Sequence, residues 1–256
     1  MMKRLTGKTA IVTGGASGIG AATAGAFAAE GANVVFCDLD ETKGNQLATA
    51  IRNAGGEVHF VPADVSRSDS VQALVAFTAG RFGKIDILFA NAGYQFVKPL
   101  AEIEEDEWDR LLAVNLKGVF LCAKYVIPNM VRAGGGSIIA TGSVLSFTAA
   151  PGLAAYGATK AGIVNLIRGI ATDYGQQGIR ANTICPGCID TPLADVFFDS
   201  QPDPRAAKQA SACSHSLGRI GSAAEVAKAA VFLAGDESSF ITGAAITVDG
   251  GLTAKL

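Results

Sequence analysis

The sequence predicts an α/β fold, a doubly wound parallel sheet of seven strands with helices on both faces. Apolar runs rich in β-forming residues alternate with segments of helix length. The runs are continuously apolar, as in strands that are covered on both faces. No Pro/Ser-rich linker, charge block or internal repeat divides the chain, so we expect one domain over residues 1–256. The expected strands are 9–13, 33–37, 58–61, 85–90, 137–141, 180–185 and 245–248.

Composition excludes several classes of function. The chain has 256 residues, of which 49% are hydrophobic and 17% charged, with 21 Lys+Arg against 23 Asp+Glu. This balance leaves no basic surplus for nucleic acid. Residues 9–29 and 133–159 carry no charge, but their many small and turn residues argue against a membrane span, and no leader-like apolar run starts the chain. Five scattered Cys suit reduced thiols. We expect a cytoplasmic protein.

The first strand leads into a glycine-rich turn. Thr13-Gly14-Gly15-Ala16-Ser17-Gly18-Ile19-Gly20 follows the strand and opens an Ala-rich helix. Such glycines allow a tight turn, close approach of the backbone to a pyrophosphate, and close helix packing. Taken alone, the string could be a plain strand-to-helix turn. In this context it predicts a dinucleotide site in a Rossmann-type fold, with cofactor contacts from Gly14, Ser17, Gly18, Ile19 and Gly20.

The end of the second strand predicts which dinucleotide binds. Asp38 lies 18 residues after Gly20, and no Lys or Arg stands between Thr13 and Asp38. A carboxylate there accepts hydrogen bonds from the ribose hydroxyls and repels a 2′-phosphate. We therefore predict NAD rather than NADP, with Asp38 and Leu39 at the ribose. Asp38 could also cap the next helix, and the two roles are compatible.

Five motifs follow one another along the chain in a recognisable order. They are the glycine turn, Asn91-Ala92-Gly93, Ser143, Tyr156 with Lys160, and Pro186-Gly187. Their order and spacing, including 13 residues from Ser143 to Tyr156, resemble the single-domain branch of the short-chain dehydrogenase/reductase family. The resemblance extends from residue 7 to residue 251. One departure is Ala90, where the family usually has Asn, and we expect this position to lie away from the chemistry.

The resemblance implies further cofactor contacts and a tetramer. Asp64 and Val65 would lie at the adenine, followed by Asn91, Ala92 and Gly93, and Pro186, Gly187, Ile189 and Thr191 would lie beside the nicotinamide. A homotetramer is the family expectation. Its contacts would come from the helix that carries Tyr156, which is rich in small residues, from the helix before it, and from the strand at 245–251.

The catalytic prediction centres on Tyr156 and Lys160. Residues four apart share one face of a helix, and an ammonium beside a phenol lowers the pKa of the phenol from about 10. The resemblance implies that Tyr156 exchanges a proton with the substrate oxygen and that Lys160 also holds the nicotinamide ribose. It further implies that Ser143 hydrogen-bonds the substrate oxygen and that Asn115 holds a water linking Lys160 to solvent. Taken singly, each residue has an ordinary structural explanation.

Other patterns suggest chemistry that we do not expect. The two histidines, His59 in a strand and His215 in a late segment, lack the context of a serine hydrolase. Cys185 and Cys188 have dithiol spacing but follow a strand rather than open a helix. The acidic residues between 102 and 109 are better explained as a solvated helix start than as a metal site, so no metal is predicted.

The substrate side is predicted to combine a lid segment with a mainly apolar pocket. Residues 190–221 contain three prolines and predict an irregular lid segment. Lid candidates are Leu193, Val196, Phe197 and Phe198. Candidates for the pocket are Tyr94, Gln95, Ser143, Leu145, Phe147, Leu153, Tyr156 and Cys188. Because this lining is mainly apolar, a strongly anionic substrate is not expected unless Lys98, Arg205 or Lys208 reaches in.

We expect an NAD-dependent oxidoreductase that acts on a small-molecule secondary alcohol, either small, cyclic or polyol-like. The alternative enzyme is a 3-oxoacyl-(acyl-carrier-protein) reductase, which the chain also resembles. That group typically prefers NADPH and presents basic residues after the Tyr–Lys helix, whereas residues 173–178 carry none and Arg180 is the nearest. A catalytically silent nucleotide sensor is the third hypothesis, and the intact catalytic set argues against it.

Overall fold

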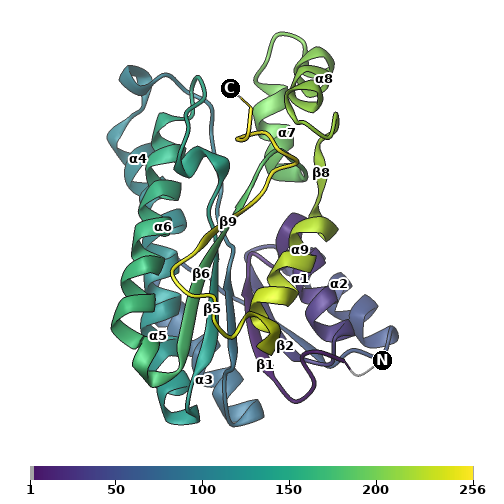
Figure 1. Ribbon diagram of the computed structural model, residues 1–256, viewed down its shortest axis with the longest axis vertical. Coiled ribbons are helices and arrows are strands. Elements are labelled where there is room, and N and C mark those ends of the chain that lie inside the picture. Colours follow the sequence, from purple (N-terminus) through teal and green to yellow (C-terminus); the bar gives the residue numbers. More distant parts are fainter. Residues whose placement is uncertain (1–2, 256) are drawn as a thin grey trace.

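The computed structural model describes residues 3–255 and confirms the predicted parallel sheet. Seven strands are ordered β3-β2-β1-β4-β5-β6-β9 (Figure 1). Their order reverses between β1 and β4, where a crevice opens at the carboxyl ends of the strands. The bounds are β1 Thr9–Thr13, β2 Asn33–Asp38, β3 Val58–Pro62, β4 Ile87–Ala90, β5 Gly136–Thr141, β6 Ile179–Pro186 and β9 Ala245–Val248.

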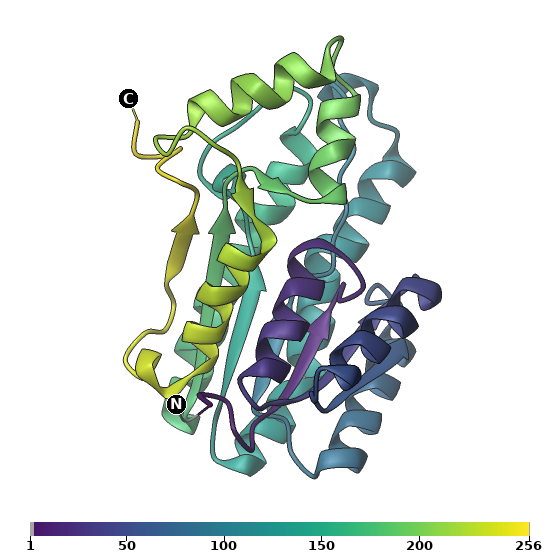
Figure 2. The ribbon, with the colours of Figure 1, turned by 90° about the vertical axis from the view of Figure 1, so that its right-hand side faces the viewer.

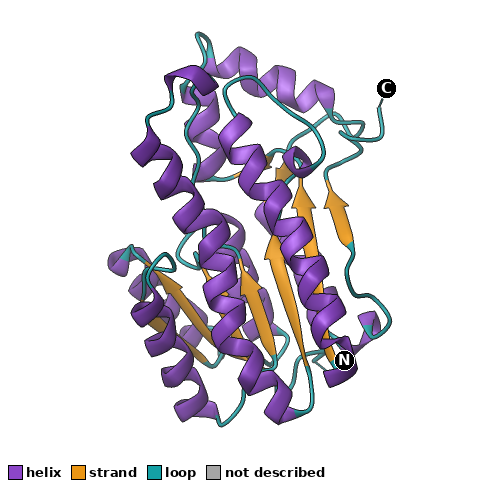
Figure 3. Ribbon diagram, turned by 90° about the vertical axis from the view of Figure 1, so that its left-hand side faces the viewer, coloured by secondary structure: helices purple, strands orange, loops and turns teal. Residues whose placement is uncertain are grey.

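Helices cover both faces of the sheet and enclose two separate cores. On one face lie α1 (Gly18–Ala29), α2 (Glu41–Asn53) and α9 (Ala223–Ala234) (Figure 2). On the other lie α3 (Ser68–Phe82), α5 (Gly118–Ala133) and α6 (Ala154–Tyr174) (Figure 3). Successive residues of a strand point to opposite faces, so Ile11 enters one core and Val12 the other. Burial on both faces explains the continuously apolar strand sequences.

Shorter elements complete the chain. The helix α4 (Glu105–Leu112) joins α5 through a π-helical turn at Ala113–Lys117, and Glu104 with Glu107 forms its capping box. The acidic run is thus a helix start, as expected. Short 3₁₀ turns lie at Leu100–Glu102, Val144–Ser146, Gly175–Gln177 and Asp236–Ser238.

One long helical stretch, Glu105–Ala133, has the length and hydropathy of a membrane span. It differs from the two charge-poor windows considered in the sequence. Half of its most apolar window is buried in the protein, and Val119, Val126 and Met130 pack in the core on the α3, α5 and α6 face. The stretch therefore packs as a core helix.

The segment 190–221 is not irregular, so that prediction is wrong. It forms α7 (Pro192–Asp199) and α8 (Pro204–Ser214), framed by a two-stranded ribbon of β7 (Ile189–Asp190) and β8 (Gly221–Ser222). Each helix has its proline at the first position, where no backbone N–H is needed, and Thr191 and Asp203 cap the two N-termini. Two of the three prolines therefore start helices. Both helices stand beyond the carboxyl ends of the strands (Figures 1 and 2).

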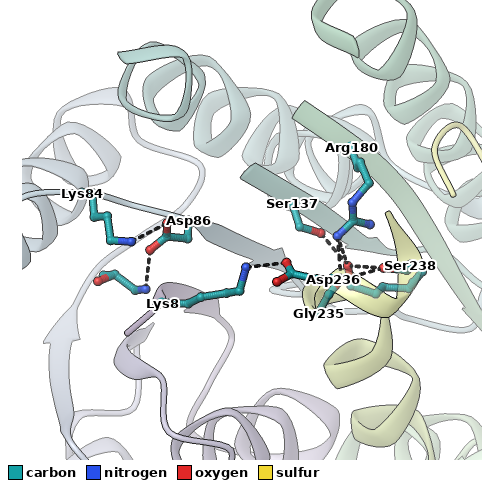
Figure 4. Close-up of polar contacts among 10 residues, drawn as sticks. Lys8, Lys84, Asp86, Ser137, Arg180, Gly235, Asp236 and Ser238 are labelled. Atoms are coloured by element: carbon teal, nitrogen blue, oxygen red, sulfur yellow. Dashed lines mark hydrogen bonds and ion pairs between the residues drawn. The ribbon is translucent and has the colours of Figure 1, made fainter. Parts of the chain in front are cut away.

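The opposite end of the sheet is held by polar contacts to the end of α9 (Figure 4). The Arg180 guanidinium donates to the carbonyls of Leu233 and Gly235 at 2.8 and 3.1 Å, and the Ser137 hydroxyl donates to Leu233 at 2.8 Å. These bonds satisfy carbonyls that a helix C-terminus leaves unpaired. Arg180, the basic residue nearest to the Tyr–Lys helix in sequence, therefore points inward as a cap.

Candidate active site

A cleft of about 540 Å³ opens at the carboxyl ends of the strands. Nearly all predicted site residues line it. They are Gly14, Ser17, Gly18, Ile19, Asp38, Leu39, Asp64, Val65, Asn91, Ala92, Gly93, Tyr94, Gln95, Ser143, Leu145, Leu153, Tyr156, Lys160, Pro186, Gly187, Cys188, Ile189 and Thr191. Gly20 and Asn115 lie behind its wall, and the pocket candidate Phe147 and the lid candidates Val196 and Phe198 also lie outside it.

The glycine turn has the shape of a phosphate cradle. Gly14 and Gly18 have φ values of 63° and 51°, a region that favours glycine. A Cβ at Gly14 would lie 2.7 Å from the Ala92 Cα, and one at Gly20 would collide with the Gly14 carbonyl oxygen. Gly20 thus acts through close packing of α1 beneath the turn. The helix N-terminus carries no acidic side chain in its first turn, which suits an anion.

Asp38 holds this turn as well as facing the cleft. Its Oδ2 accepts a hydrogen bond from the Ala16 N–H at 3.0 Å, and its Oδ1 accepts one from the Asp40 N–H at 3.1 Å. The cap of α2 is Asp40, whose side chain accepts from Lys43 N and pairs with the Lys43 ammonium at 2.8 Å. Asp38 is therefore not the helix cap. Its carboxylate oxygens keep lone pairs for ribose hydroxyls.

Ser143, Tyr156 and Lys160 meet at one part of the cleft. Tyr156 and Lys160 lie on α6, as predicted, and are 8% and 3% exposed. The Lys160 Nζ lies 5.5 Å from the centre of the Tyr156 ring and donates to the Thr141 carbonyl at 2.8 Å. The Ser143 oxygen accepts from Leu145 N at 3.1 Å, which leaves its hydroxyl hydrogen free to donate. The geometry can serve proton transfer at an oxygen.

The electrostatics of the pair differ from the sequence prediction. Burial raises the pKa of Tyr156 in the protein alone, and its hydrogen bond with Ser143 only partly offsets this. Burial also lowers the pKa of Lys160 to about 8. The expected lowering of the Tyr156 pKa is thus wrong for the unliganded chain, because desolvation of a buried phenol outweighs its other contacts. Further positive charge near the phenol is needed to favour phenolate.

Asn115 is positioned by the π-helical turn. The turn adds a residue between α4 and α5, and Asn115 is fully buried there. Its amide bonds both backbone groups of Tyr94 at 3.0 Å and donates to the Thr159 hydroxyl at 3.2 Å. A Cβ at Gly93 would lie 3.1 Å from the Asn115 Oδ1 and 3.7 Å from the Lys160 Nζ. Asn115 therefore fixes the loop that borders Lys160.

The substrate side combines three loops with α7. Leu193 and Phe197 of α7 line the cleft, and Gln95 Nε2 donates to the Leu193 carbonyl at 2.8 Å. Three predicted residues lie elsewhere. Phe147 is half exposed outside the wall, Val196 is exposed, and Phe198 is buried at 3% exposure. On α7, the register allows only some of the apolar side chains to face the cleft.

Several cleft residues escaped the sequence prediction. Arg110 comes from α4, Val114 from the π-helical turn, Ser211 from α8 and Leu252 from the C-terminal segment. The rest of the wall is Ala63, Thr141, Gly142, Val144, Ala150, Pro192 and Ala194. These residues are brought in by tertiary packing.

The basic side chains that line the cleft differ from those predicted. Lys98 pairs with Glu107 and Lys208 with Asp190, each at 2.7 Å, and neither lines the cleft. Arg205 also lies outside the wall. Arg110 does line it, with its guanidinium carbon 5.8 Å from the centre of the Tyr94 ring. The cleft therefore has a cation on its wall besides Lys160, which the sequence prediction overlooked.

Cys185 and Cys188 are not joined by a disulfide. Both are free, with Cys185 buried on β6 and Cys188 at the cleft wall. Burial raises the pKa of both thiols, which disfavours the reactive thiolate.

The arrangement of a dinucleotide cradle beside a Ser–Tyr–Lys group defines a nicotinamide-dependent oxidoreductase. Residues 14–253 match the family model described as "Enoyl-(Acyl carrier protein) reductase". The chain belongs to the short-chain dehydrogenase/reductase family.

Named relatives and a solved structure resemble the chain over nearly its full length. It is 42% identical to cis-4-hydroxycyclohexanecarboxylate dehydrogenase of Sinomonas cyclohexanicum, covering 96% of this chain and 97% of the relative. It is 36% identical to the 3-oxoacyl-(acyl-carrier-protein) reductase FabG of Thermotoga maritima, covering 97% and 99%. The crystal structure of levodione reductase superposes with a TM-score of 0.96 at 34% identity, covering 99% and 100%.

Proposed function

We propose that the protein is an NAD-dependent dehydrogenase that oxidises the secondary alcohol of a small ring compound to the ketone. One observation carries the proposal: Ser143, Tyr156 and Lys160 line the same cleft as the glycine turn and Asp38. A substrate oxygen beside Tyr156 and a dinucleotide on the turn would therefore share one continuous space.

The residues present fit NAD. The turn leaves no room for side chains at Gly14 and Gly20, and the N-terminus of α1 suits a pyrophosphate. Asp38 would accept the ribose hydroxyls and would repel a 2′-phosphate. Lys43, the cation near this carboxylate, is already paired with Asp40. These features favour NAD over NADP.

Ser143, Tyr156 and Lys160 would orient the substrate oxygen and move its proton. When bound, the cofactor supplies the hydride acceptor and, in its oxidised form, a positive charge. Tyr156 would take the proton of the alcohol once such added positive charge lowers its raised pKa. Ser143 would donate its hydroxyl hydrogen to the same substrate oxygen and hold that oxygen in place. Lys160, fixed by the Thr141 carbonyl, keeps further N–H donors for the ribose.

Asn115 would hold the water that links Lys160 to solvent, in addition to fixing Tyr94. Its place next to Gly93 and Lys160 supports this role. The two helices α7 and α8 would act as the lid, because α7 contributes Leu193 and Phe197 to the cleft and is tied to Gln95.

A ring alcohol suits the substrate side. Leu145, Leu153, Leu193 and Phe197 give it an apolar wall that would pack against a hydrocarbon ring. The relative from Sinomonas cyclohexanicum is named as a cis-4-hydroxycyclohexanecarboxylate dehydrogenase, which also favours a ring.

We propose a cytoplasmic homotetramer. Phe120 of α5 and Phe147 are exposed aromatic side chains, and β9 is an edge strand of the sheet. Exposed apolar groups and an open strand edge are features that association between copies would cover.

The alternative is a 3-oxoacyl-(acyl-carrier-protein) reductase, which the relative from Thermotoga maritima supports. Arg180 argues against it, because this side chain caps α9 instead of facing an acidic carrier protein. The experiment is a turnover screen with NAD and NADP on ring alcohols, polyols and hydroxyacyl thioesters. We expect NAD reduction with ring alcohols. Turnover restricted to thioesters with NADP would establish the alternative, and no turnover with any substrate would favour a nucleotide sensor.

A further inference from the structure

His215 is a buried titratable side chain that the proposed chemistry does not use. It follows α8 directly and is 2% exposed. Its Nδ1 lies 2.7 Å from the Ser211 carbonyl oxygen, and its Nε2 lies 3.2 Å from the Cys188 backbone N. A carbonyl can only accept and a backbone N–H can only donate. The imidazole is therefore neutral, with its proton on Nδ1.

Both partners of His215 belong to the wall of the cleft. Cys188 lies with Gly187 in the loop between β6, which ends at Pro186, and β7, and Ser211 lies on α8. The Cys188 carbonyl accepts from Gly221 N at 2.9 Å, so β8 holds the other side of the same peptide segment. The single imidazole thus joins the loop after β6 to the second helix of the proposed lid.

The C-terminal turn encloses the imidazole from a third side. A Cβ at Gly187 would lie 3.0 Å from the His215 Nε2, and one at Gly250 would lie 3.5 Å from its Cδ2. Beyond the ring, Leu217 N donates to the Gly250 carbonyl at 3.1 Å. Figures 1 and 2 show the C-terminal segment ending on the same side of the molecule as α7 and α8. Any movement of His215 would disturb three segments around the substrate side.

Other charged or titratable groups near His215 have partners of their own or stay neutral. Asp249, on the C-terminal turn, accepts from the Thr253 hydroxyl and from the N–H groups of Gly251 and Thr253. Lys208, on α8, is paired with Asp190 at 2.7 Å. Burial raises the pKa of the Cys188 thiol, so the thiol stays protonated at neutral and acidic pH. Among these groups, His215 is the one whose hydrogen bonding reverses when the ring gains a second proton, because its Nε2 accepts from the Cys188 N–H.

We propose that His215 is a positioning residue that latches α8 to the Cys188 loop, and that its protonation opens this latch. An imidazolium carries N–H groups on both nitrogens, so its Nε2–H would face the Cys188 N–H, donor against donor. The ring or the loop must then move away, and the wall of the substrate side loosens. The consequence for turnover rests on the proposed function, whereas the latch itself rests on the contacts of His215 alone.

The test compares the full-length wild type with His215→Gln, and His59→Gln is the matched control because the chain has two histidines. Glutamine can accept from the Cys188 N–H but does not titrate. Hydrogen exchange of the segments 186–191 and 208–217 is measured at about pH 8 and about pH 5.5, corrected for the intrinsic rate. We expect both segments to lose protection at the lower pH in the wild type and in His59→Gln, but not in His215→Gln. An unchanged wild type, or the same loss in His215→Gln, would overturn the proposal.

Kinetics provide the second readout. In the wild type and His59→Gln, the KM for the alcohol should rise about tenfold between these pH values beyond any change in kcat, whereas in His215→Gln it should change less than about twofold. An equal KM rise in His215→Gln would contradict the latch. If the exchange result is as expected but no ring alcohol is oxidised, the latch stands and the proposed substrate class fails. Comparable thermal unfolding of the variants confirms that the fold is intact.

Discussion

Replacing Asp38 by Asn should change which cofactor the protein uses. The two carboxylate oxygens accept from different backbone groups, Ala16 N–H at 3.0 Å and Asp40 N–H at 3.1 Å. An amide has only one acceptor oxygen, so its NH₂ group would face one of these N–H donors. The variant therefore loses both the negative charge and part of the support for the glycine turn.

The size of the change in kcat/KM follows from the lost hydrogen bonds to the charged carboxylate and from the lost repulsion toward a 2′-phosphate. Hydrogen bonds to a charged group are worth about 1.5–3 kcal/mol, so kcat/KM for NAD should fall roughly 10- to 150-fold. Removing the repulsion toward a 2′-phosphate should raise kcat/KM for NADP about tenfold or more. The loss of one backbone contact should cost about 1–2 kcal/mol of the free energy of unfolding.

The assay is the ratio of kcat/KM for NAD to that for NADP, measured on one alcohol with wild type and variant. Urea unfolding of both proteins separates the loss of stability from the loss of affinity. Equal use of the two cofactors by the wild type, or an unchanged ratio in the variant, would refute the proposed role of Asp38 in selecting NAD.

Three further predictions concern stability, pH and substrate charge. Arg180→Met removes two bonds to the end of α9 and should lower the free energy of unfolding by about 1–3 kcal/mol while kcat/KM stays unchanged, and an unchanged urea midpoint would contradict the capping role. Lys160 has its pKa lowered to about 8 in the fold, so the buried ammonium destabilises the protein below pH 8 and this cost is relieved as pH rises toward 10.5. Lys160→Met should thus be inactive yet more stable at pH 7 by about 1–3 kcal/mol, with the difference shrinking above pH 8 in urea titrations; a difference that does not shrink would contradict this sign. Arg110→Leu should raise the KM about tenfold for a ring alcohol that carries a carboxylate and leave that for the uncharged ring unchanged, whereas equal effects on both would show a purely steric role.

The sheet could be predicted closely from the sequence because its strands are buried on both faces. A continuous run such as Ile138–Ile139 supplies one side chain to each core, and such runs stand out against the helices between them. The residues of the glycine turn and the Tyr156–Lys160 spacing were likewise visible, since both depend on local geometry.

The structure of 190–221, the position of Arg110 and the pKa of Tyr156 were not predicted, because they depend on capping and on contacts between distant segments. Prolines in 190–221 suggested irregular structure, but Pro192 and Pro204 occupy the first positions of helices, where the caps Thr191 and Asp203 decide the outcome. Arg110 reaches the cleft because the π-helical turn and its neighbours orient α4, a feature with no clear sequence signal. The pKa of Tyr156 depends on burial, and burial of a side chain beside a cleft follows from the whole fold.

We propose above that Tyr156 transfers the proton in a site whose residues fit NAD. The most direct measurement compares NAD reduction and NAD affinity in wild type and Tyr156→Phe, with affinity taken from fluorescence titration. We expect kcat to fall at least about 100-fold while the Kd for NAD stays within a few-fold, because the ring remains and only the hydroxyl is lost. Normal turnover by Tyr156→Phe would contradict it.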